Sequence, residues 1–119
     1  MNRSVLLVDD DPVFRGLARR LLCAAGLTVI AEADTVSAAL TAAASAQPAA
    51  ALVDMELPDG NGIDLARQLV ALPWEPLVLL TSIDADAAAG DDVKRSGAIA
   101  FVHKADLPNA PLARLLGAH

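Results

Sequence analysis

The sequence has one cysteine, Cys23, and very few aromatic residues: two phenylalanines, one tryptophan and no tyrosine. A single cysteine excludes an internal disulfide bond and favours a reducing compartment, so we expect a cytoplasmic protein. We expect Cys23 itself to be buried and unreactive, as free cysteines usually are. With 3% aromatic residues but 26 alanines among 119 residues, the core is predicted to be aliphatic, with alanine-rich helices packed closely on it.

Basic residues are also scarce. Nine lysines and arginines face fifteen acidic residues, which gives a net charge of −6. Without a basic stripe to neutralise phosphates, direct nucleic-acid binding is not expected. No apolar stretch approaches 18 residues, so no membrane span is predicted, and the acidic residues 9–11 interrupt any N-terminal signal peptide. The length fits one domain, residues 1–119.

The sequence does contain four short apolar runs that each end on a reactive polar residue. Parallel strands of one sheet would bring these ends to one edge, where open α/β sheets place their ligand sites. The four runs and the polar residues after them are Val5–Val8 with Asp9, Asp10 and Asp11; Ala50–Val53 with Asp54; Leu77–Leu80 with Thr81; and Ile99–Val102 with His103 and Lys104.

Strand and helix patterns alternate five times along the chain. The helices are delimited by Asp11 as an N-cap, Gly26 as a stop, Thr35 as a second start, and prolines at 48 and 73. Over 85–96 the helical pattern is weak, because Gly90 lies inside it and large apolar residues are almost absent before Val93. The predicted strands cover about 4–8, 28–33, 50–53, 77–81 and 99–102, and the helices about 12–25, 35–47, 63–72, 85–96 and 110–117, with a turn at 58–62.

This alternation predicts a doubly wound (βα)5 flavodoxin-like α/β domain. The runs lack polar alternation, as expected for parallel strands buried on both faces. The predicted strand order is 2-1-3-4-5, with the topological switch point between the first and third strands. That order places Asp9 and Asp10 beside Asp54.

Three neighbouring carboxylates favour a divalent cation, because like charges raise one another's pKa. Mg²⁺ prefers oxygen ligands and is usually held by one or two carboxylates together with a phosphate. An aspartate can act as a nucleophile toward phosphorus, and the Lys104 ammonium and Thr81 hydroxyl would stabilise the transferred group. The sequence therefore predicts a site at which a phosphoryl group is transferred in the presence of Mg²⁺.

Four motifs in order, each at a strand end, carry a resemblance to a known family. They are Val-Asp-Asp at 8–10, Asp-Met-Glu-Leu-Pro-Asp-Gly-Asn-Gly at 54–62, Leu-Leu-Thr-Ser at 79–82 and Phe-Val-His-Lys at 101–104. Over essentially its whole length the chain resembles the receiver domain of bacterial two-component response regulators. The resemblance implies that Asp54 is the phospho-acceptor and that Thr81 and Lys104 hold the phosphoryl group. It also implies that Asp10 binds Mg²⁺ directly and Asp9 more through water, with the backbone carbonyl of Glu56 completing the protein ligands. Phe101 would be the aromatic switch residue.

The resemblance also implies a role and partners. The domain would accept a phosphoryl group from a sensor histidine kinase, a phosphotransfer protein or a small acyl phosphate, with Mg²⁺ or alternatively Mn²⁺. It would then change the face made by the fourth helix, fifth strand and fifth helix. That face would regulate a separate protein or a covalently linked output domain, and phosphorylation-dependent homodimers are common in such proteins. Beyond its own phosphorylation and dephosphorylation, no enzymatic activity is expected.

Three positions depart from the commonest pattern of such domains. Phe101 lacks the hydroxyl of the usual tyrosine, so its ring could be buried but could not hydrogen-bond. Glu56 adds a negative charge at the pocket mouth, and Ile83 is bulky and apolar. The last two flank the path of the hydrolytic water, so slow loss of the phosphoryl group is predicted. Because the fourth helix is weak, the geometry of the output face cannot be copied from relatives.

Other interpretations remain open at this stage. Asp9 and Asp11 form the Asp-x-Asp of haloacid-dehalogenase-like phosphohydrolases, in which Asp9 would be the nucleophile. Against this, the chain has no room for a cap domain, and Asp11 is better explained as a helix cap. A pseudo-receiver that binds partners without phosphorylation, and a flavodoxin-like FMN carrier, share the fold. We expect His103 to be exposed and without a role, and residues 59–62 simply to turn the chain and begin a helix.

Overall fold

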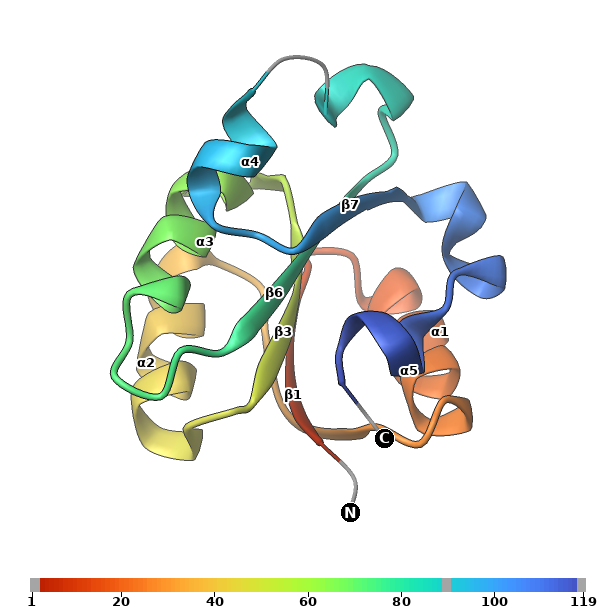
Figure 1. Ribbon diagram of the computed structural model, residues 1–119, viewed down its shortest axis with the longest axis horizontal. Coiled ribbons are helices and arrows are strands. Elements are labelled where there is room, and N and C mark those ends of the chain that lie inside the picture. The colour runs from red at the N-terminus through yellow and green to blue at the C-terminus, as the bar shows by residue number, and fades with distance from the viewer. Residues whose placement is uncertain (1–2, 89–90, 118–119) are drawn as a thin grey trace.

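A computed structural model describes residues 3–88 and 91–117 and has a five-stranded parallel sheet at its centre (Figure 1). The strands lie in the order β2-β1-β3-β6-β7, which confirms the predicted order 2-1-3-4-5. Each predicted strand is found to within one residue at either end. Their bounds are β1 (Ser4–Val8), β2 (Thr28–Ala33), β3 (Ala50–Asp54), β6 (Leu77–Ser82) and β7 (Ala100–His103).

Five α-helices cover the two faces of the sheet. In Figure 1, α2, α3 and α4 lie on one side of it, and α1 and α5 lie on the other. This division is that of a doubly wound α/β fold. The helices are α1 (Pro12–Ala24), α2 (Val36–Ala46), α3 (Gly62–Val70), α4 (Asp92–Ser96) and α5 (Leu112–Leu115).

The first three helices begin where local hydrogen bonds can satisfy their free backbone N–H groups. The side chains of Asp11, Thr35 and Asn61 accept from the backbone N–H groups of residues 13, 38 and 64. Each cap side chain occupies one of the four donors that a helix start leaves without a partner. After α1, the chain reverses through Gly26 at φ 86°, a backbone conformation that favours glycine. The predicted Asp11 cap is therefore confirmed.

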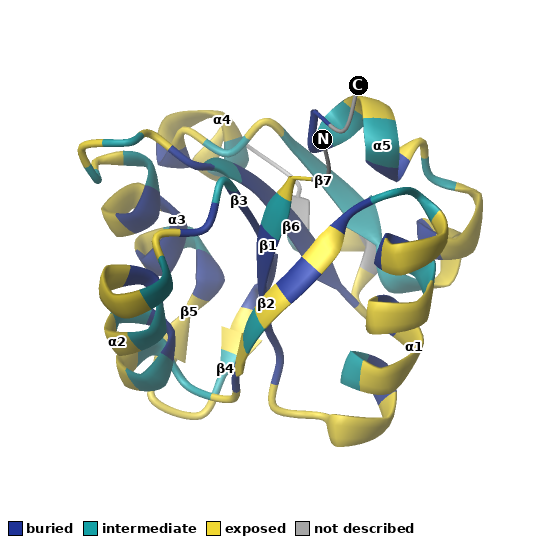
Figure 2. Ribbon diagram, turned by 90° about the horizontal axis from the view of Figure 1, so that it is seen from below, coloured by how far each residue is buried: buried dark blue, intermediate teal, exposed yellow. Residues whose placement is uncertain are grey.

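The core is aliphatic, as predicted, and is divided by the sheet into two clusters. Along β1, Val5 and Leu7 face the cluster under α1 and α5, whereas Leu6 and Val8 face the cluster under α2 and α3. Such alternation follows from the two-residue period of a strand. Figure 2 shows the inner strands buried and the edge strand β2 partly exposed, between helices whose outer faces are exposed. Small residues such as Ala39 in α2 let a helix backbone approach the sheet closely.

The C-terminal third differs from its prediction. The continuous helix predicted over 85–96 is wrong: a 3-10 turn, η1 (Ala85–Ala88), precedes the five-residue α4, and Gly90 lies outside the described residues. Gly97, at φ 85°, ends α4. The helix predicted over 110–117 shrinks to the four residues of α5 and follows a 3-10 segment, η2 (Lys104–Asn109). Few apolar residues over 85–96, and prolines at 108 and 111, explain why regular helix is short here.

One further expectation needs correction. Cys23 is exposed, because Phe14, Ala18 and Leu22 form the buried stripe of α1 and Cys23 falls outside it. The turn predicted at 58–62 is present, and it belongs to a small antiparallel hairpin of β4 (Glu56–Leu57) with β5 (Gly60–Asn61). Among the helices of the described ranges, none combines the length and apolarity needed to cross a membrane.

Candidate functional site

The register of the sheet places the predicted site residues along one edge. Asp9 directly follows Val8, which is paired with Val53, the residue before Asp54. Across the next pair of strands, Asp54 is the direct partner of Thr81. Lys104 follows the last residue of β7, which lies beside β6. The carboxyl ends of four strands therefore bring these side chains together, as the sequence predicts.

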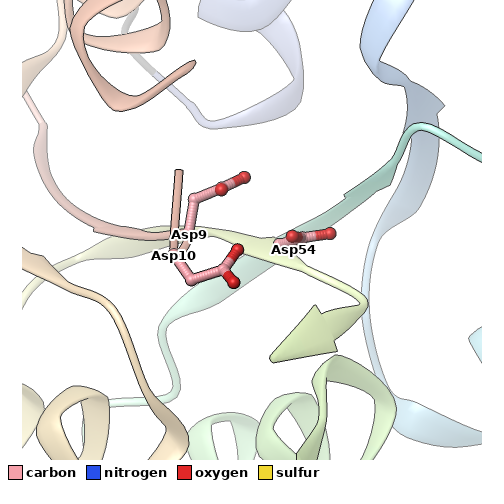
Figure 3. Close-up of side chains that lie close together, drawn as sticks. All are labelled: Asp9, Asp10 and Asp54. Atoms are coloured by element: carbon pink, nitrogen blue, oxygen red, sulfur yellow. The ribbon is translucent and has the colours of Figure 1, made fainter. Parts of the chain in front are cut away.

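Three carboxylates form an acidic cluster at this edge. Asp9, Asp10 and Asp54 each place a carboxylate oxygen within 4.8 Å of the others, and Figure 3 shows Asp9 and Asp10 extending toward the side on which Asp54 stands. Asp9 and Asp54 are buried, whereas Asp10 is exposed. Asp11 is not part of the cluster because its carboxylate caps α1. The cluster thus has two fixed, buried members and one member accessible from solvent.

Lys104 is the cation of the site. Its Nζ lies 2.6 Å from Oδ2 of Asp9 and 3.5 Å from Oδ2 of Asp54, and only 12% of its side chain is exposed. The same Nζ lies 4.1 Å from the ring centroid of Phe14, within cation–π distance. This contact could not be read from the sequence, since nothing in a helical pattern indicates which aromatic ring will contact a distant lysine. Lys104 is therefore held over the cluster from two sides.

Thr81 presents a hydroxyl that has no partner. Its Oγ1 is fully buried and makes no hydrogen bond within residues 3–88 and 91–117. Buried hydroxyls are nearly always hydrogen-bonded, so an exception requires an explanation. Because Thr81 neighbours Asp54 across the sheet, a ligand oxygen bound at Asp54 would supply the missing partner.

The charges of the site are not balanced by the protein alone. Burial, and then the neighbouring charge of Asp9, raise the pKa of Asp54 above its usual 3.8, while Lys104 and the Glu56 N–H oppose the rise. Three carboxylates and one ammonium leave an excess of negative charge. A hard divalent cation would remove this excess, and the carboxylate oxygens present are the ligands that Mg²⁺ prefers. The residues therefore fit a Mg²⁺ ion on chemical grounds.

An open cleft of about 400 Å³ gives access to these groups, with Asp10, Asp54, Glu56, Ile83 and Lys104 in its wall. Ile83 is 72% exposed there, an unusual position for a large apolar side chain. Phe101 does not line this cleft. It is half-buried on β7 against the core beneath α2 and α3.

The loop behind Asp54 is held by contacts that the sequence did not reveal. A Cβ at Gly62 would lie 2.3 Å from the carbonyl oxygen of Asp54, so only glycine allows α3 to begin so close to the site. The carboxylate of Asp59 accepts hydrogen bonds from the backbone N–H groups of Val36 and Ser37, 2.7 and 3.1 Å away. These residues therefore do more than turn the chain, because Asp59 also caps α2 from a distant loop.

His103 also has a role that was not expected. It is half-buried, and its Nε2 lies 2.7 Å from the carbonyl oxygen of Ile83. This contact joins the end of β7 to the loop that follows β6. The expectation that His103 is exposed and without a role is therefore wrong.

Comparison with known proteins identifies the family of this chain. The family of response regulator receiver domains matches residues 5–114. The chain belongs to this family. The receiver domain is 40% identical over 113 residues to the DNA-binding transcriptional activator DevR/DosR of Mycobacterium tuberculosis, covering 93% of this chain and 51% of that protein. It is 40% identical over 119 residues to the photosynthetic apparatus regulatory protein RegA of Rhodobacter capsulatus, covering 95% and 63%.

Solved structures agree with this assignment. The receiver domain matches the signal receiver domain of the response regulator NarL from Mycobacterium tuberculosis with a TM-score of 0.85 and 27% identity, covering 98% of this chain and 95% of that one. Response regulator receiver domains are a signalling family and not a catalytic one, so membership of this family, and not the fold alone, argues against the hydrolase and FMN-carrier interpretations. The chain spans 51% of the length of DevR/DosR and 63% of that of RegA.

Proposed function

We propose that this receiver domain is a phosphorylation-dependent switch that accepts a phosphoryl group on Asp54 in the presence of Mg²⁺. The observation that supports this most directly is the asymmetric surrounding of Asp54. Two carboxylates come from β1 on one side of Asp54, whereas a hydroxyl and an ammonium come from β6 and β7 on the other side. The hydroxyl is that of Thr81, which has no hydrogen-bond partner among the described residues, and the ammonium is that of Lys104, 3.5 Å from Asp54. The first set suits a cation and the second suits the oxygens of a phosphoryl group.

In the proposed site, Asp10 and Asp54 bind the ion directly, Asp9 acts more through water, and the backbone carbonyl of Glu56 completes the protein ligands. The ion, Mg²⁺ or alternatively Mn²⁺, supplies charge neutralisation for the incoming phosphoryl oxygens. Glu56 already lines the cleft and donates its backbone N–H to Oδ1 of Asp54 over 3.3 Å. That bond leaves Oδ2 of Asp54 on the side that faces Lys104.

The proposed chemistry is a direct transfer. An Asp54 carboxylate oxygen attacks phosphorus, the new O–P bond forms, and the N–P bond of a phosphohistidine breaks with the electron pair returning to the imidazole. No separate general base is required, because the ionised carboxylate is the attacking form and carries no proton that must be removed. Thr81 and Lys104 bind the phosphoryl oxygens, and stabilising charge on those oxygens is the main catalytic requirement of phosphoryl transfer.

The donor in this proposal is a sensor histidine kinase or a phosphotransfer protein, acting in the cytoplasm. Phosphorylation biases two pre-existing states of the domain, and Phe101 follows the loop after β6 inward. The changed face of α4, β7 and α5 then regulates a partner protein or a linked output domain, or forms a homodimer. Residues 1–119 act as one receiver domain, without nucleic-acid binding or an enzymatic activity of their own.

Intact-mass spectrometry after incubation with acetyl phosphate tests the proposal. The expected result is one phosphoryl adduct that requires Mg²⁺ and is absent from Asp54→Asn. Asp64→Asn, an exposed aspartate on α3, is the matched control and should still be modified. Absence of the adduct from the unaltered chain, with both acetyl phosphate and a panel of phosphorylated histidine kinases, would contradict the proposal. An adduct that survives Asp54→Asn would instead favour Asp9 and the hydrolase chemistry.

A further inference from the structure

Arg15 connects the acidic pair to the neighbouring strand. It lies in the first turns of α1, and its Nη1 donates to the backbone carbonyl oxygen of Asp9 over 2.6 Å. Its Nε donates to Oε1 of Glu32 on β2 over 3.1 Å. One guanidinium therefore spans from the edge strand of the sheet to the loop that carries the proposed metal ligands.

The two acidic residues of that loop are held very differently. Both the backbone and the side chain of Asp9 are held by contacts. Its N–H donates to the carbonyl of Ala33, and its carboxylate accepts from the N–H of Asp11 and pairs with Lys104. Asp10 is exposed, and its side chain makes no hydrogen bond or ion pair with any described residue. No side-chain contact within the described residues therefore fixes its carboxylate, whose position depends on the backbone that carries it and on its own side-chain torsions.

The carbonyl that accepts from Arg15 belongs to the peptide between Asp9 and Asp10. The hydrogen bond therefore restrains the ψ angle of Asp9 and the φ angle of Asp10, which together place the backbone that carries the Asp10 carboxylate. A net change in these two angles would move that carboxylate and would first have to break a charge-assisted hydrogen bond, which is stronger than a neutral one.

We propose that Arg15, itself anchored by Glu32, is a positioning residue that aims the Asp10 carboxylate into the metal site. This inference rests on the proposed function, because it concerns the affinity of the same site for its cation. Outer groups that orient metal ligands commonly change metal affinity by about 10-fold to 100-fold when removed. A planar guanidinium suits this role because its fork serves the carbonyl and the carboxylate together, which a lysine ammonium cannot reproduce.

The charge of Arg15 does not prevent it from lying near a cation site. Glu32 pairs with Arg15 and also with Arg19, and these contacts hold the pKa of Glu32 below its usual value. Glu32 is therefore ionised at neutral pH and offsets the guanidinium charge. The side chains of Arg15 and Glu32 are 22% and 31% exposed, so this pairing is partly shielded from water.

Arg19 provides a matched control on the same helix. It lies one turn after Arg15, its Nε donates to Oε2 of the same Glu32 over 3.0 Å, and its side chain is 46% exposed. It makes no hydrogen bond to the loop of residues 9–11. Replacing Arg19 removes an arginine–Glu32 pair but leaves the contact with the Asp9 carbonyl in place.

The experiment is a titration of the isolated domain with Mn²⁺, in which electron paramagnetic resonance measures the free ion and Mg²⁺ competes for the site. Arg15→Ala is expected to weaken binding of both ions by about tenfold, whereas Arg19→Ala should bind as the unaltered chain does. Arg15→Lys should bind more weakly than the unaltered chain. In acetyl phosphate reactions, Arg15→Ala should raise the Mg²⁺ concentration for half-maximal modification and leave the plateau rate unchanged.

Urea unfolding of each variant separates positioning from stability, because Arg15→Ala and Arg19→Ala both lose an ion pair with Glu32. Equal metal affinities for Arg15→Ala and Arg19→Ala would overturn the inference and leave the proposed function intact. If Arg15→Ala does not fold, the metal affinity of Arg15→Lys is the deciding measurement. A metal affinity of Arg15→Lys equal to that of the unaltered chain would overturn the inference. Failure of the unaltered chain to bind either ion would overturn the proposed function as well.

Discussion

Replacing Lys104 by methionine should destabilise the protein by leaving Asp9 as a buried charge without a partner. Asp9 is fully buried, and the 2.6 Å contact with Lys104 is its only ion pair in the described part of the chain. Removing one member of a buried pair costs about 3–5 kcal/mol. We expect about 3 kcal/mol, the low end of that range, because the 12% exposure of Lys104 lets water replace part of the lost interaction. Methionine keeps an unbranched stem beside Phe14.

Trp74 is a suitable reporter for the urea unfolding that measures this loss. It is the only tryptophan, and its indole N–H donates to the carbonyl oxygen of Pro48 over 2.8 Å. It precedes β6 in the chain, at the edge of the sheet opposite the site, so its fluorescence should follow folding and not metal binding. Added Mg²⁺ should reduce the difference between Lys104→Met and the unaltered chain, because a bound cation stabilises the folded state and replaces the missing charge.

Two controls make the result specific. Arg67→Met breaks an exposed pair with Asp64 and should cost only about 0.5 kcal/mol or less. In a double-mutant cycle, Asp9→Asn should remove most of the penalty of Lys104→Met, because the buried charge is then gone. If Lys104→Met and Arg67→Met cost the same, or if the two site mutations prove additive, the reasoning from the buried pair is refuted.

Two further predictions concern the loops around the site. Asp59→Asn should lower the melting temperature at neutral pH, because the backbone N–H groups of Val36 and Ser37 hold the pKa of Asp59 below its usual 3.8. Because the pKa of Asp59 is lower in the folded than in the unfolded chain, its ionised carboxylate stabilises the folded state at pH values above the usual pKa. This stabilisation is lost as the pH falls through the pKa of the folded state, so the two melting curves should converge in acid. A difference that persists there would contradict this. Ile83→Ser should shorten the lifetime of the phosphorylated domain several-fold by opening the path of water to Asp54, measured by loss of the mass adduct after acetyl phosphate is removed. An unchanged lifetime would refute the shielding role of Ile83.

Sequence reasoning was most accurate where local pattern and topology decide the structure. Apolar runs without alternation located all five strands, and cap residues such as Asp11 and Thr35 located helix starts. Once the strands are parallel and in this order, the convergence of Asp9, Asp54 and Thr81 follows from geometry alone, because all of them lie at strand ends. The proximity of these residues was therefore predictable although they lie far apart in the chain.

The contacts that support the site were not predictable in the same way. The cap that Asp59 places on α2 joins residues 23 positions apart through side-chain geometry that no local pattern encodes. The short α4 reflects how few large apolar residues precede Val93, and the 3-10 segment η2 contains Pro108, but neither signal alone fixes where regular helix begins or ends. Arg15 and Arg19 look equivalent as basic residues of one amphipathic helix, and only the structure shows that Arg15 alone reaches the Asp9 carbonyl.

The site in this structure carries two unfavourable features that a phosphoryl group would remove together. Ionisation of Asp54 is opposed by burial and by Asp9, and the buried hydroxyl of Thr81 has no hydrogen-bond partner among the residues that the structure describes. Lys104 meanwhile lies closer to Asp9 than to Asp54. A cation at the acidic pair would take over the charge that Lys104 now offsets, which would leave the ammonium available to the phosphoryl oxygens. A ligand shifts an equilibrium only by binding one state more tightly than the other. In the proposed switch, the phosphoryl group would favour the active state through the interactions that Asp54 and Thr81 lack in this structure.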